Sequence, residues 1–121
     1  LLIKSVPEGT PVKTKIPLVD IINTGGKETA SLPGVTETLL LKIWASNTVA
    51  TYARITRTIQ KKFWKMTSDL PEFLVDFMHH DFGYRGVSSE ETAGFLGLAA
   101  LSSGYVGTDT MRAIKFGQKY Y

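Results

Sequence analysis

Aromatic and cationic side chains gather in one short, glycine-rich segment. Phe82, Tyr84 and Arg85 fall within four positions, with Gly83 and Gly86 beside them. An aromatic ring can stack on a flat heterocycle, and a guanidinium can bind phosphate oxygens through paired hydrogen bonds. Glycine lets the backbone bend sharply or approach a ligand closely. The segment therefore suits a base joined to a sugar phosphate. The alternative, which residue statistics favour, is a core Phe82 and a surface Arg85.

A second candidate is Asp109, which follows Gly107 and Thr108. Its carboxylate could accept a hydrogen bond from the amide NH2 of a ligand, a contact of roughly 1.5 to 3 kcal/mol. It would also repel the matching carboxylic acid, and so discriminate between the two by charge. The alternative is that Asp109 only caps the helix that follows it.

Two adjacent histidines, His79 and His80, stand beside Asp81 and suggest a metal site. Adjacent residues on a strand point to opposite faces, so the two imidazoles could not easily share one ion. We therefore predict no metal site. One histidine should face the pocket at the strand end, and the other should pack under a helix.

Five cations recur at spacings of three and four along one stretch and would form a basic stripe on a helix. They are Arg54, Arg57, Lys61, Lys62 and Lys65. Such a stripe could bind nucleic acid, but no recognised DNA-binding or RNA-binding signature accompanies it. We interpret it as the solvated face of an amphipathic helix.

The elements that must position these residues begin with residues 12 to 23, whose alternation predicts a strand or two. Pro17 would confine part of that run to a sheet edge. Residues 36 to 67 contain neither proline nor glycine, and apolar residues recur there at helical spacing. Two helices are expected, with a break near the capping residues Ser46 and Asn47.

The second half of the chain predicts alternating strands and helices. Residues 77 to 84 read as a strand, and Ser88 with Glu91 forms a capping-box pattern before a largely apolar, buried helix. Residues 105 to 107 could form a very short strand, and Asp109 or Thr110 could cap a last helix.

This order predicts an α/β fold, either a parallel sheet or a barrel, in which ligands meet the carboxyl ends of the strands. Those ends would be residues 82 to 85 and residues 108 to 109. The two candidate segments should therefore lie together.

Composition sets broad limits. The chain has 121 residues, 43% of them hydrophobic and 21% charged, with no cysteine and a net charge of +3. These values fit one small globular core in a reducing compartment such as the cytoplasm, without a disulfide framework. No apolar run approaches the ~20 residues of a membrane span. The chain begins with Leu1 rather than methionine and ends on Gln118 to Tyr121 without a capping glycine or polar tail. We therefore expect a piece of a longer protein.

Residues 80 to 94, His-Asp-Phe-Gly-Tyr-Arg-Gly-Val-Ser-Ser-Glu-Glu-Thr-Ala-Gly, closely resemble a signature of nicotinamide phosphoribosyltransferases. Residues 107 to 110 are similar to a second block of that family, and residues 119 to 121 continue it. Residues 6 to 9, 37 to 40 and 48 to 51 resemble the family more loosely.

The resemblance implies a type II phosphoribosyltransferase with an irregular α/β barrel, working as a homodimer with active sites at the subunit interface. It implies that Phe82 stacks on the pyridine ring of nicotinamide and that Arg85 contacts the diphosphate side of phosphoribosyl pyrophosphate (PRPP). Asp109 would bind the carboxamide, and His80 would line the tunnel beside the ring. Mg²⁺ would accompany the diphosphate, and ATP could assist the full-length enzyme.

Family enzymes are several times longer than this chain. It lacks the block with their phosphorylated catalytic histidine and the N-terminal segment whose tyrosine, from the partner subunit, closes the ring sandwich. We therefore assign substrate-binding residues but no catalytic residue, and we expect the piece alone to be inactive. Within it, residues 1 to 35 would be a strand-rich lead-in, 36 to 70 a helical segment and 77 to 121 the start of the barrel.

The predicted activity is transfer of the phosphoribosyl group of PRPP to nicotinamide in NAD biosynthesis, in the cytoplasm and without a nucleic-acid or membrane partner. Two alternatives stay open: a nicotinate-using phosphoribosyltransferase, against which the charge of Asp109 weighs, and a non-enzymatic basic module that binds nucleic acid.

Overall fold

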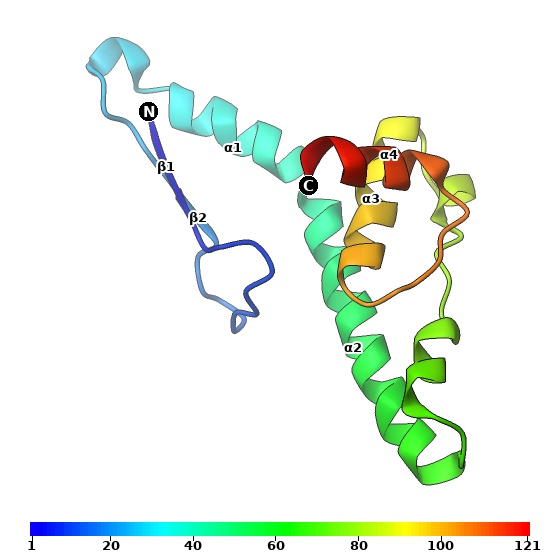
Figure 1. The fold of residues 1–121 in the computed structure, drawn as a ribbon. Coiled ribbons are helices and arrows are strands. Elements are labelled where there is room, and N and C mark those ends of the chain that lie inside the picture. The colour runs from blue at the N-terminus through cyan, green and yellow to red at the C-terminus, as the bar shows by residue number, and fades with distance from the viewer. The chain divides into compact units, whose positions relative to one another are not determined.

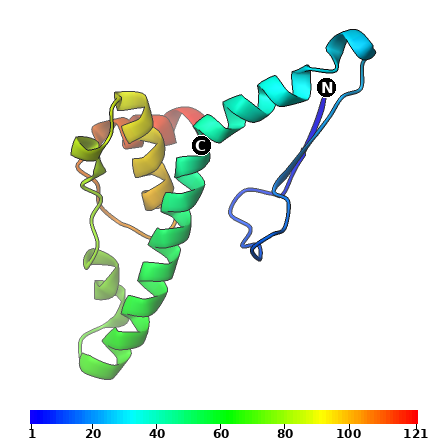
Figure 2. The ribbon, with the colours of Figure 1, turned by 180° about the vertical axis from the view of Figure 1, so that it is seen from behind.

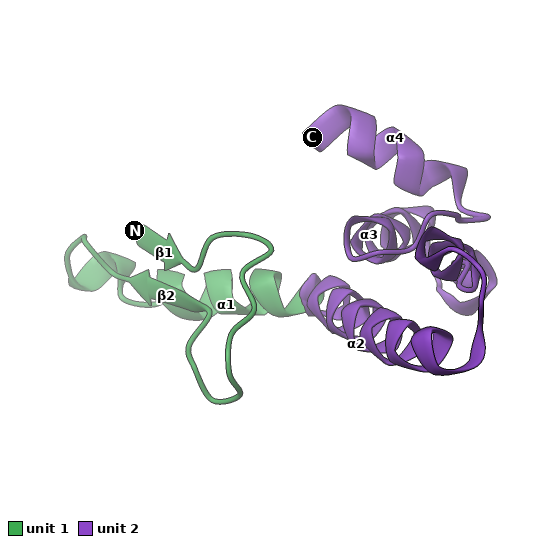
Figure 3. Ribbon diagram, turned by 60° about the horizontal axis from the view of Figure 1, so that its bottom comes forward, with its two compact units in different colours: residues 1–42 green, residues 43–121 purple.

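The computed structural model describes residues 1–121, and the chain forms two compact units, Leu1–Lys42 and Ile43–Tyr121 (Figure 3). The structure is mostly helical, with one two-stranded sheet. The α/β class is compatible with this content, and the barrel stays a prediction. None of the helices combines the length and the apolar character that a bilayer crossing requires.

The first unit is built on an antiparallel pair, β1 (Leu2–Ser5) and β2 (Val19–Ile22), in which Leu2 lies opposite Ile22 (Figure 1). Of the strand predicted in residues 12 to 23, only β2 forms. Pro17 lacks a backbone N–H and cannot donate to a ladder, so the pairing starts beyond it. A 3₁₀ turn, η1 (Lys27–Thr29), and helix α1 (Leu32–Lys42) complete this unit, and α1 contacts β2.

Two helices span the predicted helical segment, but their break is not at Ser46 and Asn47, which lie inside α2 (Trp44–Thr67). Instead Ile43 separates α1 from α2, with φ −96° and ψ 1°, outside the helical region. No side chain caps α2 there. The prediction failed because it relied on capping side chains, whereas a single non-helical residue suffices to end one helix and begin the next.

The second unit packs three helices in layers, with α3 (Glu90–Ser102) between α2 and α4 (Met111–Tyr120), as Figures 2 and 3 show. Small residues make this close packing possible: a Cβ at Gly94 would lie 2.3 Å from the Phe116 ring. The rings of Phe95 and Phe116 stack at 4.9 Å. The buried hydrophobic residues of the chain are all in this unit, namely Ala53, Val75, Ala93, Ala100, Ala113 and Phe116.

The strand predicted for residues 77 to 84 is wrong. Two 3₁₀ helices, η2 (Glu72–Phe77) and η3 (Gly83–Gly86), take up its two ends, and the residues between them form no strand. Residues 105 to 107 form no strand either. What remains of the predicted pairing is one isolated parallel bridge between Asp81 and Thr108. The chain turns directly after this bridge because the Gly83 N–H bonds the side chain of Asp81, a local turn that competes with strand extension.

The cap of α3 is also one residue away from the predicted position. Ser89, not Ser88, has the extended backbone of a cap, and its hydroxyl accepts a hydrogen bond from the N–H of Thr92 at 3.1 Å. The Ser88 and Glu91 capping box is therefore not formed. Ser88 and Ser89 are adjacent and can cap a helix equally well, so the sequence pattern alone could not show which of them is the cap.

Candidate functional site

The bridge at Asp81 brings the two candidate segments together. The N–H of Asp81 donates to the carbonyl of Gly107 at 3.0 Å, and the N–H of Asp109 donates to the carbonyl of Asp81 at 2.9 Å. Asp81 and Thr108 are the paired residues, so Phe82 and Asp109 each lie one position after the bridge. The sequence predicted this neighbourhood from strand ends, and it holds although the strands are reduced to a single bridge.

Arg85 and Asp109, each at one of these segments, face one another. Nη2 of Arg85 lies 3.4 Å from Oδ2 of Asp109, at the long end for a hydrogen bond. The Arg85 side chain is 79% exposed and that of Asp109 is 25% exposed. An exposed pair of this kind is worth about 0 to 1 kcal/mol, so a ligand could separate it at little cost.

The alternative reading of Asp109 as a helix cap is wrong. The residue at the start of α4 is Thr110, and no side chain of the cap residue bonds the helix. Oδ1 of Asp109 instead accepts from the hydroxyl of Thr110 at 3.2 Å. The backbone N–H of Thr110 is bound by the hydroxyl of Thr108 at 2.9 Å. The Asp109 carboxylate is therefore not committed to the backbone N–H groups of α4.

Asp109 lines an open hollow of about 330 Å³, near the lower limit for small-molecule sites. Acidic and basic side chains both contribute to its wall. The lining residues are Tyr84, Glu90, Asp109, Met111, Arg112 and Lys115. Phe82 does not line this hollow. The shared nicotinamide site that the resemblance implies for Phe82 and Asp109 therefore stays a prediction.

Phe82 and His80 lie beside one another, with ring centroids 4.5 Å apart. The Phe82 side chain is exposed, which contradicts the alternative that it is a core residue. His80 also packs across to the second segment, since a Cβ at Gly107 would lie only 2.3 Å from Nδ1 of its ring. Gly107 thus allows the imidazole to rest directly on the backbone.

The two histidines have different surroundings, as adjacent residues with divergent side chains should. His79 contacts the side chain of Gln60 on α2, and its ring lies 5.1 Å from that of Tyr105. Burial, with the charge of Asp81, raises the pKa of the Tyr105 hydroxyl. His79 therefore belongs to the packing against α2, and His80 to the candidate site.

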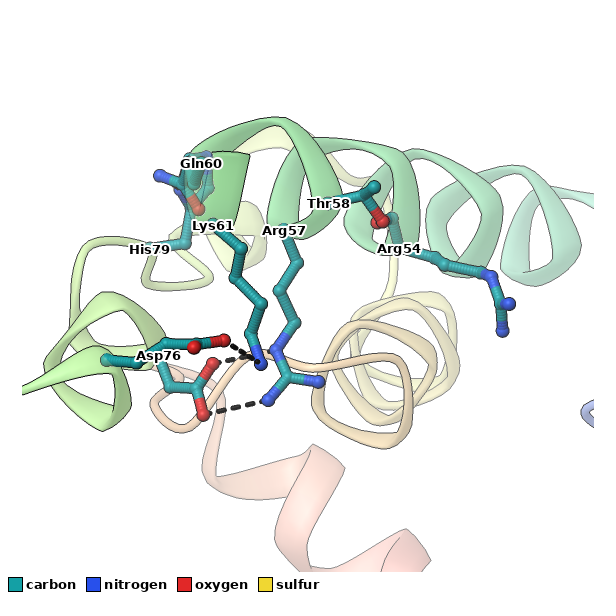
Figure 4. A network of polar contacts seen from close by, with 8 residues as sticks. Arg54, Arg57, Thr58, Gln60, Lys61, Asp76 and His79 are labelled. Carbon is teal, nitrogen blue, oxygen red and sulfur yellow. Dashed lines mark hydrogen bonds and ion pairs between the residues drawn. The ribbon is translucent and has the colours of Figure 1, made fainter. Parts of the chain in front are cut away.

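The basic stripe is largely paired within the molecule. Arg57 binds both oxygens of Asp76 at 2.7 and 2.8 Å (Figure 4), and Glu72 lies 3.5 Å from Lys61 and 3.2 Å from Lys65. The hydrogen bond with Asp76 raises the pKa of Arg57, and that with Arg57 lowers the pKa of Asp76. Three of the five cations thus hold η2 against α2. The stripe still lies at the surface, where Arg54, Lys62 and Lys65 are exposed, but most of its charge is paired with acidic side chains of η2.

Sequence reasoning missed two residues that organise the site. The carboxylate of Asp81 accepts a hydrogen bond from the hydroxyl of Thr108 at 2.7 Å and another from the N–H of Gly83 at 2.9 Å. The sequence gives a weak indication of both residues, because the side chain of an Asp or Thr in a turn commonly accepts a hydrogen bond from the backbone N–H two residues later. Neither pattern shows that the two residues meet.

Comparison with known proteins finds that the sequence is similar to part of several nicotinamide phosphoribosyltransferases. The chain is 42% identical over 119 residues to the nicotinamide phosphoribosyltransferase of Xanthomonas campestris pv. campestris, covering 98% of this chain and 25% of that protein. It is 34% identical over 122 residues to the enzyme of the same name from Acinetobacter baylyi, covering 100% of this chain and 24% of that protein.

A third nicotinamide phosphoribosyltransferase, from Mycoplasma genitalium, is 37% identical over 76 residues, 62% of this chain and 16% of that protein. No protein-family model matches the chain, and no solved structure matches it. The resemblance noted at residues 80 to 94 therefore extends over nearly the whole chain. The chain spans about a quarter of the length of the first two relatives.

Proposed function

We propose that this chain is part of a phosphoribosyltransferase that joins nicotinamide to the phosphoribosyl group of PRPP, giving nicotinamide mononucleotide and diphosphate in NAD biosynthesis. The observation that carries the proposal is the pairing of Arg85 with Asp109 at 3.4 Å. It sets a guanidinium that could bind phosphate beside a carboxylate that could bind a carboxamide, in a chain 42% identical to a nicotinamide phosphoribosyltransferase.

The reaction needs the pyridine nitrogen of nicotinamide to approach C1 of the PRPP ribose while the bond from C1 to the diphosphate oxygen breaks. Such a transfer depends on holding the two substrates in line and on stabilising the departing anion. Asp109 would accept a hydrogen bond from the carboxamide NH2, and Arg85 would bind the diphosphate side. The exposed ring of Phe82 would stack on the pyridine, with His80 beside it.

The weak pairing of Arg85 with Asp109 supports this division of roles. With both substrates bound, Arg85 and Asp109 would each give up their mutual contact for a charge-assisted hydrogen bond to a ligand. Such hydrogen bonds are roughly twice as strong as neutral ones. The carboxylate of Asp109 would also repel nicotinate, so the nicotinamide reading is preferred over the nicotinate one.

Mg²⁺ would accompany the diphosphate of PRPP. No three His, Asp or Glu side chains gather here as ligands for a metal ion. We assign no residue of this chain to the metal and derive no step through it. Assistance by ATP, and a homodimer with the site at its interface, are further proposals that concern the longer enzyme.

The test compares the 121-residue chain with the full-length enzyme that contains it, in an assay for nicotinamide mononucleotide formed from nicotinamide and PRPP. We expect turnover by the full-length enzyme, with nicotinamide preferred over nicotinate, and none by the chain alone. A full-length enzyme that uses neither base would refute the proposed function. Turnover by the chain alone would refute its status as an incomplete part.

A further inference from the structure

Asp81 makes four hydrogen bonds that join the two segments of the candidate site, although its side chain does not line the hollow beside Asp109. We propose that Asp81, acting through Thr108, is the positioning residue that fixes Asp109 and Arg85 relative to each other. This inference rests on the proposed function. It assigns a role to two residues that do not line the hollow beside Asp109.

The side chain of Asp81 reaches both segments at once. Oδ1 accepts from the N–H of Gly83 at 2.9 Å, and Oδ2 accepts from the hydroxyl of Thr108 at 2.7 Å. A 2.7 Å O–H···O bond to a carboxylate has the length of a charge-assisted contact. Gly83 stands in the turn that carries Arg85, and Thr108 directly precedes Asp109. One carboxylate therefore sets the geometry of both turns.

The hydroxyl of Thr108 carries this constraint to the start of α4. A hydroxyl has one proton to donate, and here the proton goes to Asp81. The oxygen in turn accepts the N–H of Thr110, a fully buried residue, at 2.9 Å. Asp109 thus lies between two fixed neighbours, and its own N–H binds the carbonyl of Asp81. Hydrogen bonds therefore hold the backbone at Asp109 and on both sides of it.

Helix α3 provides the place for the Asp81 carboxylate. A Cβ at Gly97 would lie 2.9 Å from Oδ2 of Asp81 and 2.8 Å from the Cβ of Ala113. Both distances are shorter than ordinary contacts, so the carboxylate rests on a helix surface that only glycine leaves open. The positioning device therefore depends on the packing of α3 against α4.

The experiment uses the full-length enzyme with a matched pair of substitutions. Thr108→Val keeps the shape of threonine but removes the hydroxyl, whereas Thr108→Ser keeps the hydroxyl. We expect Thr108→Val to lower kcat/KM for nicotinamide by roughly 10- to 100-fold, the scale of a misplaced binding group. Thr108→Ser should restore most of the wild-type value, and melting curves report the stability of both variants.

A double-mutant cycle with Asp109→Asn tests whether Thr108 acts through Asp109. If it does, Thr108→Val should change nicotinamide use far less in the Asp109→Asn enzyme than in the wild type, because residues that act as a unit are not additive. Additive effects would overturn the inference. If Thr108→Val does not fold, Asp81→Asn replaces it in the cycle with the same expectations.

The outcomes separate the inference from the function on which it rests. A wild-type enzyme that does not use nicotinamide would overturn both. An active wild type whose Thr108→Val variant has unchanged kinetics, or loses only melting temperature, would overturn the positioning role and leave the proposed function intact.

Discussion

Two arginine–aspartate pairs lie in the second unit, and they differ in geometry and in surroundings. Arg57 donates hydrogen bonds to both carboxylate oxygens of Asp76, at 2.7 and 2.8 Å, while Arg85 contacts one oxygen of Asp109 at 3.4 Å. Side-chain exposure is 37% for Arg57 and 79% for Arg85. The first pair ties η2 to α2, and the second lies at the edge of an open hollow.

The stem of Arg57 is also held in place, since a Cβ at Gly104 would lie 2.4 Å from its Cδ. Gly104 has φ +125°, a conformation that favours glycine, so the backbone there can approach the stem. Nothing comparable holds Arg85. The same two residue types thus form a closely held structural contact in one place and a longer, more exposed contact in the other.

The largest expected effect is that of Arg85→Ala on PRPP use in the full-length enzyme. Loss of a charge-assisted phosphate contact should lower kcat/KM for PRPP by an amount that corresponds to roughly 1.5 to 3 kcal/mol of transition-state stabilisation. Nicotinamide binding should be much less affected. Steady-state kinetics in both substrates and a melting curve measure this. Arg57→Ala is the matched control, and should lower the melting temperature while leaving the KM for PRPP unchanged. An unchanged PRPP dependence in Arg85→Ala would make Arg85 an ordinary surface residue.

Base selection gives the next effect. Asp109→Asn should reduce the discrimination between nicotinamide and nicotinate by about 1 to 3 kcal/mol, because a neutral amide no longer repels the nicotinate carboxylate. The ratio of kcat/KM for the two bases measures it. Stability should change little, since Asp109 does not cap α4. Asp76→Asn makes the same chemical change in the structural pair and should leave the base ratio as it is.

The glycine under the Asp81 carboxylate offers a third test, now of stability. Gly97→Ala should destabilise the enzyme by about 1 to 3 kcal/mol, the cost of overpacking, because the new methyl meets Ala113 and Asp81. Gly34→Ala is the control, since a Cβ there has nothing within 4 Å and alanine favours helix. Urea unfolding compares them. Equal stability of the two variants would show that α3 does not seat the carboxylate closely.

The smallest effect concerns the pH dependence of the structural pair. The hydrogen bond from Arg57 lowers the pKa of Asp76 below its unfolded value, so the pair stabilises the fold above about pH 4. That contribution is lost as pH falls through the folded pKa. Asp76→Asn should therefore cost up to about 1 kcal/mol at neutral pH and progressively less in acid. A stability difference that does not change with pH would show that the pair contributes nothing through charge.

Local patterns in the sequence were enough to predict where helical structure forms, although not where α1 ends and α2 begins. A run without proline or glycine predicted helical structure over residues 36 to 67, and the apolar run after residue 89 predicted the packed helix α3. The placement of Phe82, Arg85 and Asp109 in adjacent turns also followed from the order of elements. The helices depend on residues a few positions apart, where backbone sterics and periodicity dominate. The adjacency of the two turns instead followed from the expected pairing of neighbouring elements.

Tertiary structure alone decided which partners these residues have. Only the fold shows that Asp109 pairs with Arg85 rather than with the N–H groups of α4, and that Asp76 neutralises Arg57. Only the fold reduces the predicted strands to one bridge and brings Asp81 against Thr108, 27 residues away. The physical reason is that a carboxylate, a hydroxyl or a strand edge can bind many partners of similar strength, and packing between distant helices selects one of them.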